Sequence, residues 1–275
     1  MKKILGLLTV AALFAGTSCT KPNSKGGQPL ESDSTFNAAN TAAQVELFYD
    51  DPLNILLQLS SGSDSSSFYR TSSGLVSACT NITVLPADTT TYPKTVTMDF
   101  GNGCVGPDGR ERSGKVVAVL SGKLNIPGST MNINLNNFAI GGIRVSGSRL
   151  LTNVSMNDTM RLTSVIHNGV VSQLTRLDLG YSDSLFLKEI PEAAGDPPTF
   201  TIGGTASLNL GYGNPVLIQI TQPLVKVITC KYFISGQFGI HQDAKSATVD
   251  FGPGLCTGVI TINVNGQSGQ TTLPD

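Results

Sequence analysis

The stretch MNINLN at residues 131–136 alternates apolar and polar side chains without a break. The same period of two recurs in ASLNL at 206–210 and in ITINV at 260–264. Successive side chains of a strand point to opposite faces of a sheet, so this pattern is typical of strands with one buried and one polar face. No long helical pattern interrupts these strands after about residue 75, which argues against parallel βαβ units and favours antiparallel pairing.

Turn-forming residues separate the alternating segments, among them Pro-Gly-Ser at 127–129, Gly-Gly at 141–142 and Asn-Gly at 168–169. The sequence therefore predicts an all-β fold class. The two architectures that fit are an antiparallel β-sandwich and an open curved half-barrel, each with internal duplication and each preceded by a short helical segment.

The helical segment is predicted from Val45, Phe48, Ile55 and Leu59, which recur near helical spacing. Pro52 suits the first turn of a helix, and Asp50 or Asp51 in front of it suits the N-cap. These signals predict either two short helices at 38–49 and 52–60 or one helix kinked at Pro52.

An internal repeat is the most specific feature of the sequence. Residues 79–103 align without a gap to residues 230–254, and TVTMDFGNGC (95–104) closely matches ATVDFGPGLC (247–256). The wider repeats cover about 79–122 and 230–266, which suggests two related halves. In each copy we expect the Phe to pack in the core, the Gly to turn the chain and the Asp to accept backbone hydrogen bonds. These residues are Asp99, Phe100, Gly101, Asp250, Phe251 and Gly252.

The chain has 275 residues and a formal net charge of −1, and only 13% of its residues are charged. That is about half the fraction usual in soluble domains. A near-neutral chain has no basic footprint, so nucleic acid is not expected as a partner. The 40% of hydrophobic residues are enough to form a core, which argues against disorder.

The N-terminus has the marks of an export signal. Lys2 and Lys3 precede an apolar run that is too short to span a bilayer, and small residues then lead to Cys19. This ending resembles a bacterial lipobox, in which the cysteine is acylated and becomes the new N-terminus. An ordinary secretory signal is the alternative. The predicted organisation is a lipoprotein signal peptide at 1–18, a flexible tether at 19–37 and a β-rich domain at 38–275.

A lipid on Cys19 would anchor the protein to the cell envelope as an outer-membrane lipoprotein. Surface-exported lipoproteins of the Bacteroidota resemble one another in having acidic residues just after the cysteine. Here Thr20, Lys21 and Pro22 follow instead, which favours a periplasm-facing position over surface display.

Four cysteines remain after Cys19, and export makes disulfides their expected state. Four cysteines allow three pairings. The repeat favours Cys79–Cys104 and Cys230–Cys256, because each pair would clamp the open end of one hairpin. A zinc site is not expected, since the chain has no Cys-x-x-Cys motif and only two histidines.

Three motifs resemble catalytic signatures without their context. Gly109 to Lys115 fits most of a P-loop, but Val116 stands where the magnesium-binding hydroxyl belongs and a strand pattern follows. Asp-Phe-Gly at 99–101 and 250–252 lacks the other kinase motifs. His167 and His241 are expected at exposed loop edges. The spacing of Asp and Glu over many loops is compatible with the paired carboxylates of a glycosidase, but the absence of Trp leaves few platforms for sugar rings. We therefore predict no catalytic residues, no metal and no cofactor.

The run Pro93-Lys94-Thr95, Asp99-Phe-Gly, Gly103-Cys104, Gly106, Asp108-Gly-Arg110, Arg112 and Gly114-Lys115 resembles a family of uncharacterised Bacteroidota lipoproteins. The resemblance covers about 45 residues and implies a β-rich exported domain with no assigned activity. We accordingly expect a non-enzymatic, membrane-anchored envelope protein with a binding or scaffolding role. The alternatives are a carrier or sensor of an apolar ligand and an envelope hydrolase. Besides the membrane, the expected partner is a protein or an apolar ligand.

Overall fold

The computed structural model describes residues 30–60, 79–88, 90–156, 159–190 and 197–275. These residues form a short 3-10 turn, η1 (Leu30–Ser32), one long helix, α1 (Ser34–Ser60), and a sheet of 13 strands. The strands are β1 (Asn81–Leu85), β2 (Lys94–Val105), β3 (Glu111–Leu120), β4 (Thr130–Ile140), β5 (Ile143–Asn153), β6 (Arg161–Ser172), β7 (Leu179–Ile190), β8 (Thr199–Asn209), β9 (Val216–Val227), β10 (Ser235–Gln242), β11 (Lys245–Pro253), β12 (Val259–Val264) and β13 (Gln267–Thr272).

The 13 strands follow one another through a single antiparallel sheet in the order of the sequence. Tight turns make this meander possible. Gly141 and Gly142 join β4 to β5 with φ of 54° and 82°, and Asn265 and Gly266 join β12 to β13 with φ of 52° and 82°. Positive φ at both central residues suits a two-residue hairpin. The prediction of antiparallel strands behind an N-terminal helix is confirmed. The sheet is one open layer, so the sandwich of two packed sheets is not formed.

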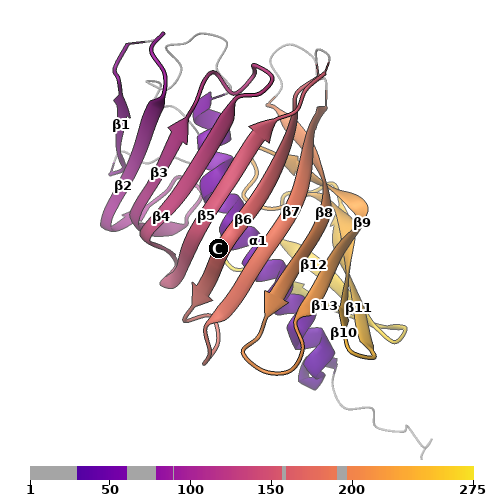
Figure 1. Cartoon of the computed structure of the whole chain (residues 1–275). Helices are drawn as coiled ribbons and strands as arrows, with labels where there is room; N and C mark the ends of the chain where they lie inside the picture. Colours follow the sequence, from indigo (N-terminus) through magenta and orange to yellow (C-terminus); the bar gives the residue numbers. More distant parts are fainter. Residues whose placement is uncertain (1–29, 61–78, 89, 157–158, 191–196) are drawn as a thin grey trace, which may run out of the picture.

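The sheet curls around α1, which lies between the β3–β8 part of the sheet and strands β10–β13 (Figure 1). The helix lies closest to β11 and β12. Four alanines, Ala38, Ala39, Ala42 and Ala43, are buried in its first half and permit a close approach of backbone to sheet. No residue between Ala38 and Leu59 is exposed. A helix buried on all sides is the core of a fold, so α1 supplies the core of this one.

The helix ends at Ser60, as predicted, but it begins before the predicted boundary at residue 38. It starts at Ser34, inside the segment assigned to the tether, because Asp33 acts as its N-cap: the backbone N–H of Thr35 donates to Asp33 Oδ1 at 2.6 Å. Pro52 lies within one continuous helix. Asp50 and Asp51 therefore do not cap a second helix. Their carboxylates bind buried cations of the sheet instead.

Each copy of the repeat contains one disulfide. Cys79–Cys104 and Cys230–Cys256, the two pairings that the repeat favours, have Cα–Cα distances of 5.7 and 5.9 Å. The first bridge lies at the β1–β2 edge of the sheet. The second connects the loops that flank β10 and β11, which are interior strands of the sheet.

The Asp-Phe-Gly triplets of the two copies have equivalent structures. Asp99 Oδ1 accepts from the backbone N–H of Gly101 at 3.0 Å, and Asp250 Oδ1 accepts from that of Gly252 at 2.7 Å. Both glycines have positive φ, 60° and 94°, and both Phe100 and Phe251 are buried. The triplets are thus turn and core elements of two related hairpins.

Candidate functional site

Most of the buried charges in the described residues lie on α1 or on side chains that face it. Three acids of the helix, Glu46, Asp50 and Asp51, are all buried. We call these residues and their sheet partners the α1 charge cluster. The partners are Asp108, Arg110, Arg112, Arg149, Tyr181, Asp183 and Lys226.

Asp51 binds two arginines from the start of β3. Arg110 Nη1 lies 3.0 Å from Asp51 Oδ1, and Arg112 donates to both carboxylate oxygens, at 2.6 and 2.8 Å. Arg112 also donates to both oxygens of Asp108. Burial alone would raise the pKa of Asp51, but Arg112 and Arg110 outweigh it and the pKa is lowered. The Gly-x-Asp-Gly-Arg-x-Arg run thus fastens the β2–β3 turn to the helix.

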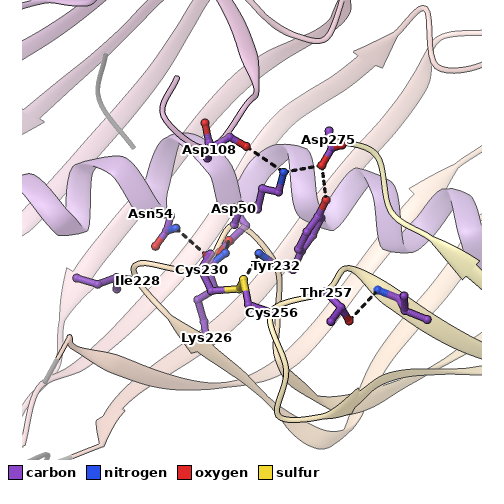
Figure 2. Close-up of a disulfide and its surroundings, with 12 residues drawn as sticks. Asp50, Asn54, Asp108, Lys226, Ile228, Cys230, Tyr232, Cys256, Thr257 and Asp275 are labelled. Carbon is purple, nitrogen blue, oxygen red and sulfur yellow. Dashed lines mark hydrogen bonds and ion pairs between the residues drawn. A yellow bond between two sulfur atoms is a disulfide. The ribbon is translucent and has the colours of Figure 1, made fainter. Parts of the chain in front are cut away.

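Lys226 of β9 forms an ion pair with Asp50, the helix residue that precedes Asp51. Its Nζ lies 2.5 Å from Asp50 Oδ2, and burial lowers the pKa of Lys226 against the attraction of Asp50. Figure 2 shows this pair beside the Cys230–Cys256 disulfide, where the side-chain amide of Asn54 donates to the carbonyl of Cys230 at 3.3 Å. Helix, β9 and the second disulfide therefore meet at one point.

Glu46 lies among β5 and β7. Tyr181 donates its hydroxyl hydrogen to Glu46 Oε1, and its ring stacks on Tyr49 with centroids 4.9 Å apart. Arg149 Nη2 lies 2.9 Å from Asp183 Oδ2. Burial, helped by the negative charge of Asp183, raises the pKa of Glu46 to about 7. Each acid of the α1 charge cluster thus faces a cation or a tyrosine hydroxyl within the protein.

Two cavities lie beside the helix, and Leu53 and Arg149 line both of them. Each has a volume of about 10 Å³, which is room for about one water molecule. Neither cavity could hold a lipid chain. No cavity larger than these is described between the acids of α1 and their partners. The α1 charge cluster therefore attaches the helix to the sheet.

The C-terminus closes the same region. Lys231 donates to the carbonyl of Asp108 at 3.0 Å and to Asp275 Oδ1 at 2.5 Å, and the hydroxyl of Tyr232 lies 2.9 Å from the same carboxylate (Figure 2). The β2–β3 turn, the β9–β10 loop and the chain end are thereby joined.

The P-loop-like lysine is a surface residue. Lys115 Nζ forms an ion pair with Asp99 Oδ2 at 2.8 Å across β2 and β3. Gly114 has a φ of 77°, and a Cβ there would lie 2.1 Å from the carbonyl oxygen of Asn137. This glycine is required by the close passage of β4, and its segment belongs to a strand.

A larger hollow lies on the opposite, solvent-facing side of the sheet. It crosses β7, β8 and β9 and has a volume of about 580 Å³. We call it the hydroxyl groove, after the hydroxyls among its polar side chains: Ser182, Ser184, Thr205, Ser207, Gln219 and His241. Leu217 adds an exposed apolar side chain to the same lining. Cross-strand pairing places Ser182 beside Ser207 and Ser184 beside Thr205. None of these four hydroxyls has a side-chain hydrogen bond within the described part of the chain.

Leu217 lies between Ser207 and His241 in the hydroxyl groove, because it pairs with Ser207 on one side and with His241 on the other. The Cα atoms of Ser207 and His241 are therefore two strand spacings apart, about 9.5 Å. Among the described residues these two side chains form no hydrogen bond with each other, the bond that would link a nucleophile to its base. Asp183 lies beneath the groove, but its carboxylate is bound to Arg149 and to the backbone N–H of Ile166. The other histidine, His167, is exposed on β6.

The sequence did not predict which residues come together in the α1 charge cluster or in the hydroxyl groove. The signal for the α1 charge cluster was present, because Glu46, Asp50 and Asp51 interrupt an otherwise apolar helix in a chain poor in charge. The hydroxyl groove had no such signal, since serine and threonine occur on the outer face of many strands.

Other predicted features fall partly outside the described residues. Cys19 and the rest of the predicted signal and anchor precede residue 30. Among the described residues, no helix combines the length and apolarity needed to cross a bilayer, and no three His, Cys, Asp or Glu side chains are grouped as metal ligands would be.

Comparison with known proteins gave no matching family model, no matching curated protein and no matching solved structure. The function therefore has to be inferred from this chain's own sites.

Proposed function

We propose that the protein is a non-enzymatic, membrane-anchored lipoprotein of the bacterial cell envelope that binds a hydroxyl-rich ligand in the hydroxyl groove. The observation that carries the proposal is the convergence of four serine and threonine hydroxyls, an amide and an imidazole on one hollow of about 580 Å³. Hydroxyls both donate and accept hydrogen bonds, so this lining complements the hydroxyls of an oligosaccharide.

Two features favour external binding over the alternative of an apolar-ligand carrier. The concave side of the sheet is occupied by α1, whose buried charges are paired with the sheet. The cavities that flank the helix are each about the size of one water molecule. A ligand of several sugar units is accommodated by the outer groove without displacing the core.

The position of the exposed Leu217 side chain between Ser207 and His241 favours binding over hydrolysis. The anchoring part of the proposal rests on the export signal and on Cys19, and it is consistent with the two disulfides, which form in oxidising compartments.

The binding proposal is tested by calorimetric titration of the mature chain carrying Cys19→Ala with neutral linear oligosaccharides of two to six sugars. Thr205→Trp places a large ring in the groove, and Asn132→Trp places the same ring on the outer face of β4 as the matched control. We expect at least one oligosaccharide to bind the parent and the control and to lose binding with Thr205→Trp. Absence of binding across the series, or equal binding by Thr205→Trp, would overturn the proposal.

A further inference from the structure

A second groove lies next to the hydroxyl groove over β7, β8 and β9 and extends to β6. It has a volume of about 360 Å³, and we call it the aromatic groove, after the Phe186 ring beside Gly203 and Pro223. On β7 the outward residues run Ser182, Ser184, Phe186 and Lys188, and successive outward residues of a strand are about 7 Å apart. The two grooves are therefore neighbours over β8, and we call them together the furrow.

Small residues of β8 make this furrow possible. Phe186 pairs directly with Gly203 across the strands. A Cβ on Gly203 would lie 2.4 Å from Cζ of that ring, so only glycine lets the ring lie over the strand. The ring nevertheless remains 60% exposed. Glycine within a strand often marks a place where a ligand approaches the backbone closely.

Two cations border the aromatic groove. Arg161 of β6 pairs with Lys188 of β7, and both side chains are exposed. Neither side chain has an ion-pair partner within the described part of the chain. Like charges directly opposite each other in a sheet repel, so an anion between them would relieve an unfavourable contact.

We infer that the furrow binds an acidic oligosaccharide, with the carboxylate of one sugar in the aromatic groove and the hydroxyls of its other sugars in the hydroxyl groove. The carboxylate would lie near Arg161 and Lys188, while the C–H face of its ring would pack on Phe186. The next sugars would donate and accept hydrogen bonds with Ser184 and Thr205 and donate to Oε1 of Gln219, whose Nε2 donates to backbone carbonyls. This inference rests on the proposed function and specifies its ligand.

An acidic peptide fits the furrow less well. Peptides that bind sheets usually do so by adding a strand to a free edge, where main-chain hydrogen bonds supply the affinity. Strands β7, β8 and β9 are each paired on both sides, so the furrow offers side chains only. Side-chain hydroxyls on a sheet face match sugar hydroxyls better than they match a peptide backbone.

The test compares tetragalacturonate with its methyl ester, which keeps the rings and removes the charge, and with tetraglutamate. Titrations use the mature Cys19→Ala chain at low salt. We expect tetragalacturonate to bind most tightly, the ester about tenfold more weakly, and tetraglutamate more weakly still.

Lys188→Gln and Arg161→Gln should each weaken tetragalacturonate binding about three- to fivefold, as expected for one exposed ion pair. Both should leave ester binding unchanged. Lys123→Gln, which removes an exposed lysine from the β3–β4 loop, is the control with the same charge change. Phe186→Ala should weaken both saccharides alike.

The outcomes separate the two proposals. Equal affinity for acid and ester, with Lys188→Gln no different from Lys123→Gln, would overturn the acidic ligand and leave the groove's function standing. Tighter binding of tetraglutamate would overturn the saccharide class. No binding of any saccharide would remove both proposals.

Discussion

Asp51 and its arginines show how strongly a few residues determine the placement of the helix. A carboxylate and two guanidinium groups, all essentially buried, form ion pairs with one another, and Asp108 adds a second carboxylate from the β2–β3 turn. Removing one member of such a group leaves the others buried without compensation, which costs more than the intact group contributes.

Asp51→Asn should therefore lower the free energy of unfolding by about 3–5 kcal/mol. Urea denaturation followed by circular dichroism measures this change. Lys115→Gln breaks the partly exposed pair with Asp99 and serves as the control, with an expected loss of at most about 1 kcal/mol. Similar losses in the two variants would contradict the central role of the buried group.

Glu46 predicts a pH dependence with a definite sign. Its pKa is raised to about 7 in the folded protein, from 4.5 for a solvent-exposed glutamate. Between these values the folded state holds a proton that the unfolded state has lost, so this group's contribution to stability falls as pH rises from about 4.5 to 7. Glu46→Gln keeps an acceptor for Tyr181 and removes the titration.

The Glu46→Gln variant should thus match the parent in stability near pH 4 and exceed it near pH 8, by up to about 3 kcal/mol. Urea denaturation at a series of pH values provides the comparison. Parallel pH profiles of parent and variant would show that Glu46 does not titrate in this range.

At the scale of elements, the alternation of apolar and polar residues predicted the strands correctly. It could not predict whether those strands form one sheet or two packed sheets. The alternation of Met131, Ile133 and Leu135 with asparagines requires one buried face, but that face can pack on a second sheet or on a helix. In this fold the buried face of the sheet packs on α1. Because α1 is buried on all sides, its sequence has no single apolar stripe that would have predicted this packing.

The ends of elements were harder to predict than their type. Asp50, Asp51 and Pro52 have the composition of a helix start, yet they lie inside α1 because buried cations of β3 and β9 compete for the carboxylates. The disulfide pairing could be predicted, since the repeat related two hairpins to each other. The furrow over β8 could not, because it depends on which strands are neighbours.

The Cys230–Cys256 disulfide should contribute to the stability of the protein by holding the loops beside β10 and β11 together. Cys230 accepts a hydrogen bond from Asn54 of the helix, and its bridge joins the loops on either side of β10 and β11. The double change Cys230→Ser with Cys256→Ser is expected to cost about 2–5 kcal/mol of stability. Urea denaturation gives the loss, and Cys79→Ser with Cys104→Ser is the matched comparison. A cost below about 1 kcal/mol for the Cys230–Cys256 pair would show that the helix and β9 hold this loop without it.

At the scale of the whole molecule, the proposed anchor determines where the protein acts. Cys19→Ala should move the protein from the membrane fraction to the soluble fraction of the cell envelope, because acyl chains on that residue would supply the attachment. Fractionation and immunoblotting measure the distribution, and Ser24→Ala in the same tether is the control. Unchanged membrane association of Cys19→Ala would contradict the lipoprotein assignment.

The order of elements along the chain has a mechanical consequence. The helix that fills the sheet is also the first long element after the predicted tether, so the predicted lipid is attached, through the 14 residues from Thr20 to Asp33, to the core itself. Tension between the membrane and a ligand on the outer face would pass along the axis of α1. The helix contacts β3, β5, β7 and β9 through side-chain bonds near its middle, from Glu46 to Asp51, so these bonds would resist such a pull together, in shear. Withdrawing the anchor by force would then mean extracting the core before any strand of the sheet is peeled away.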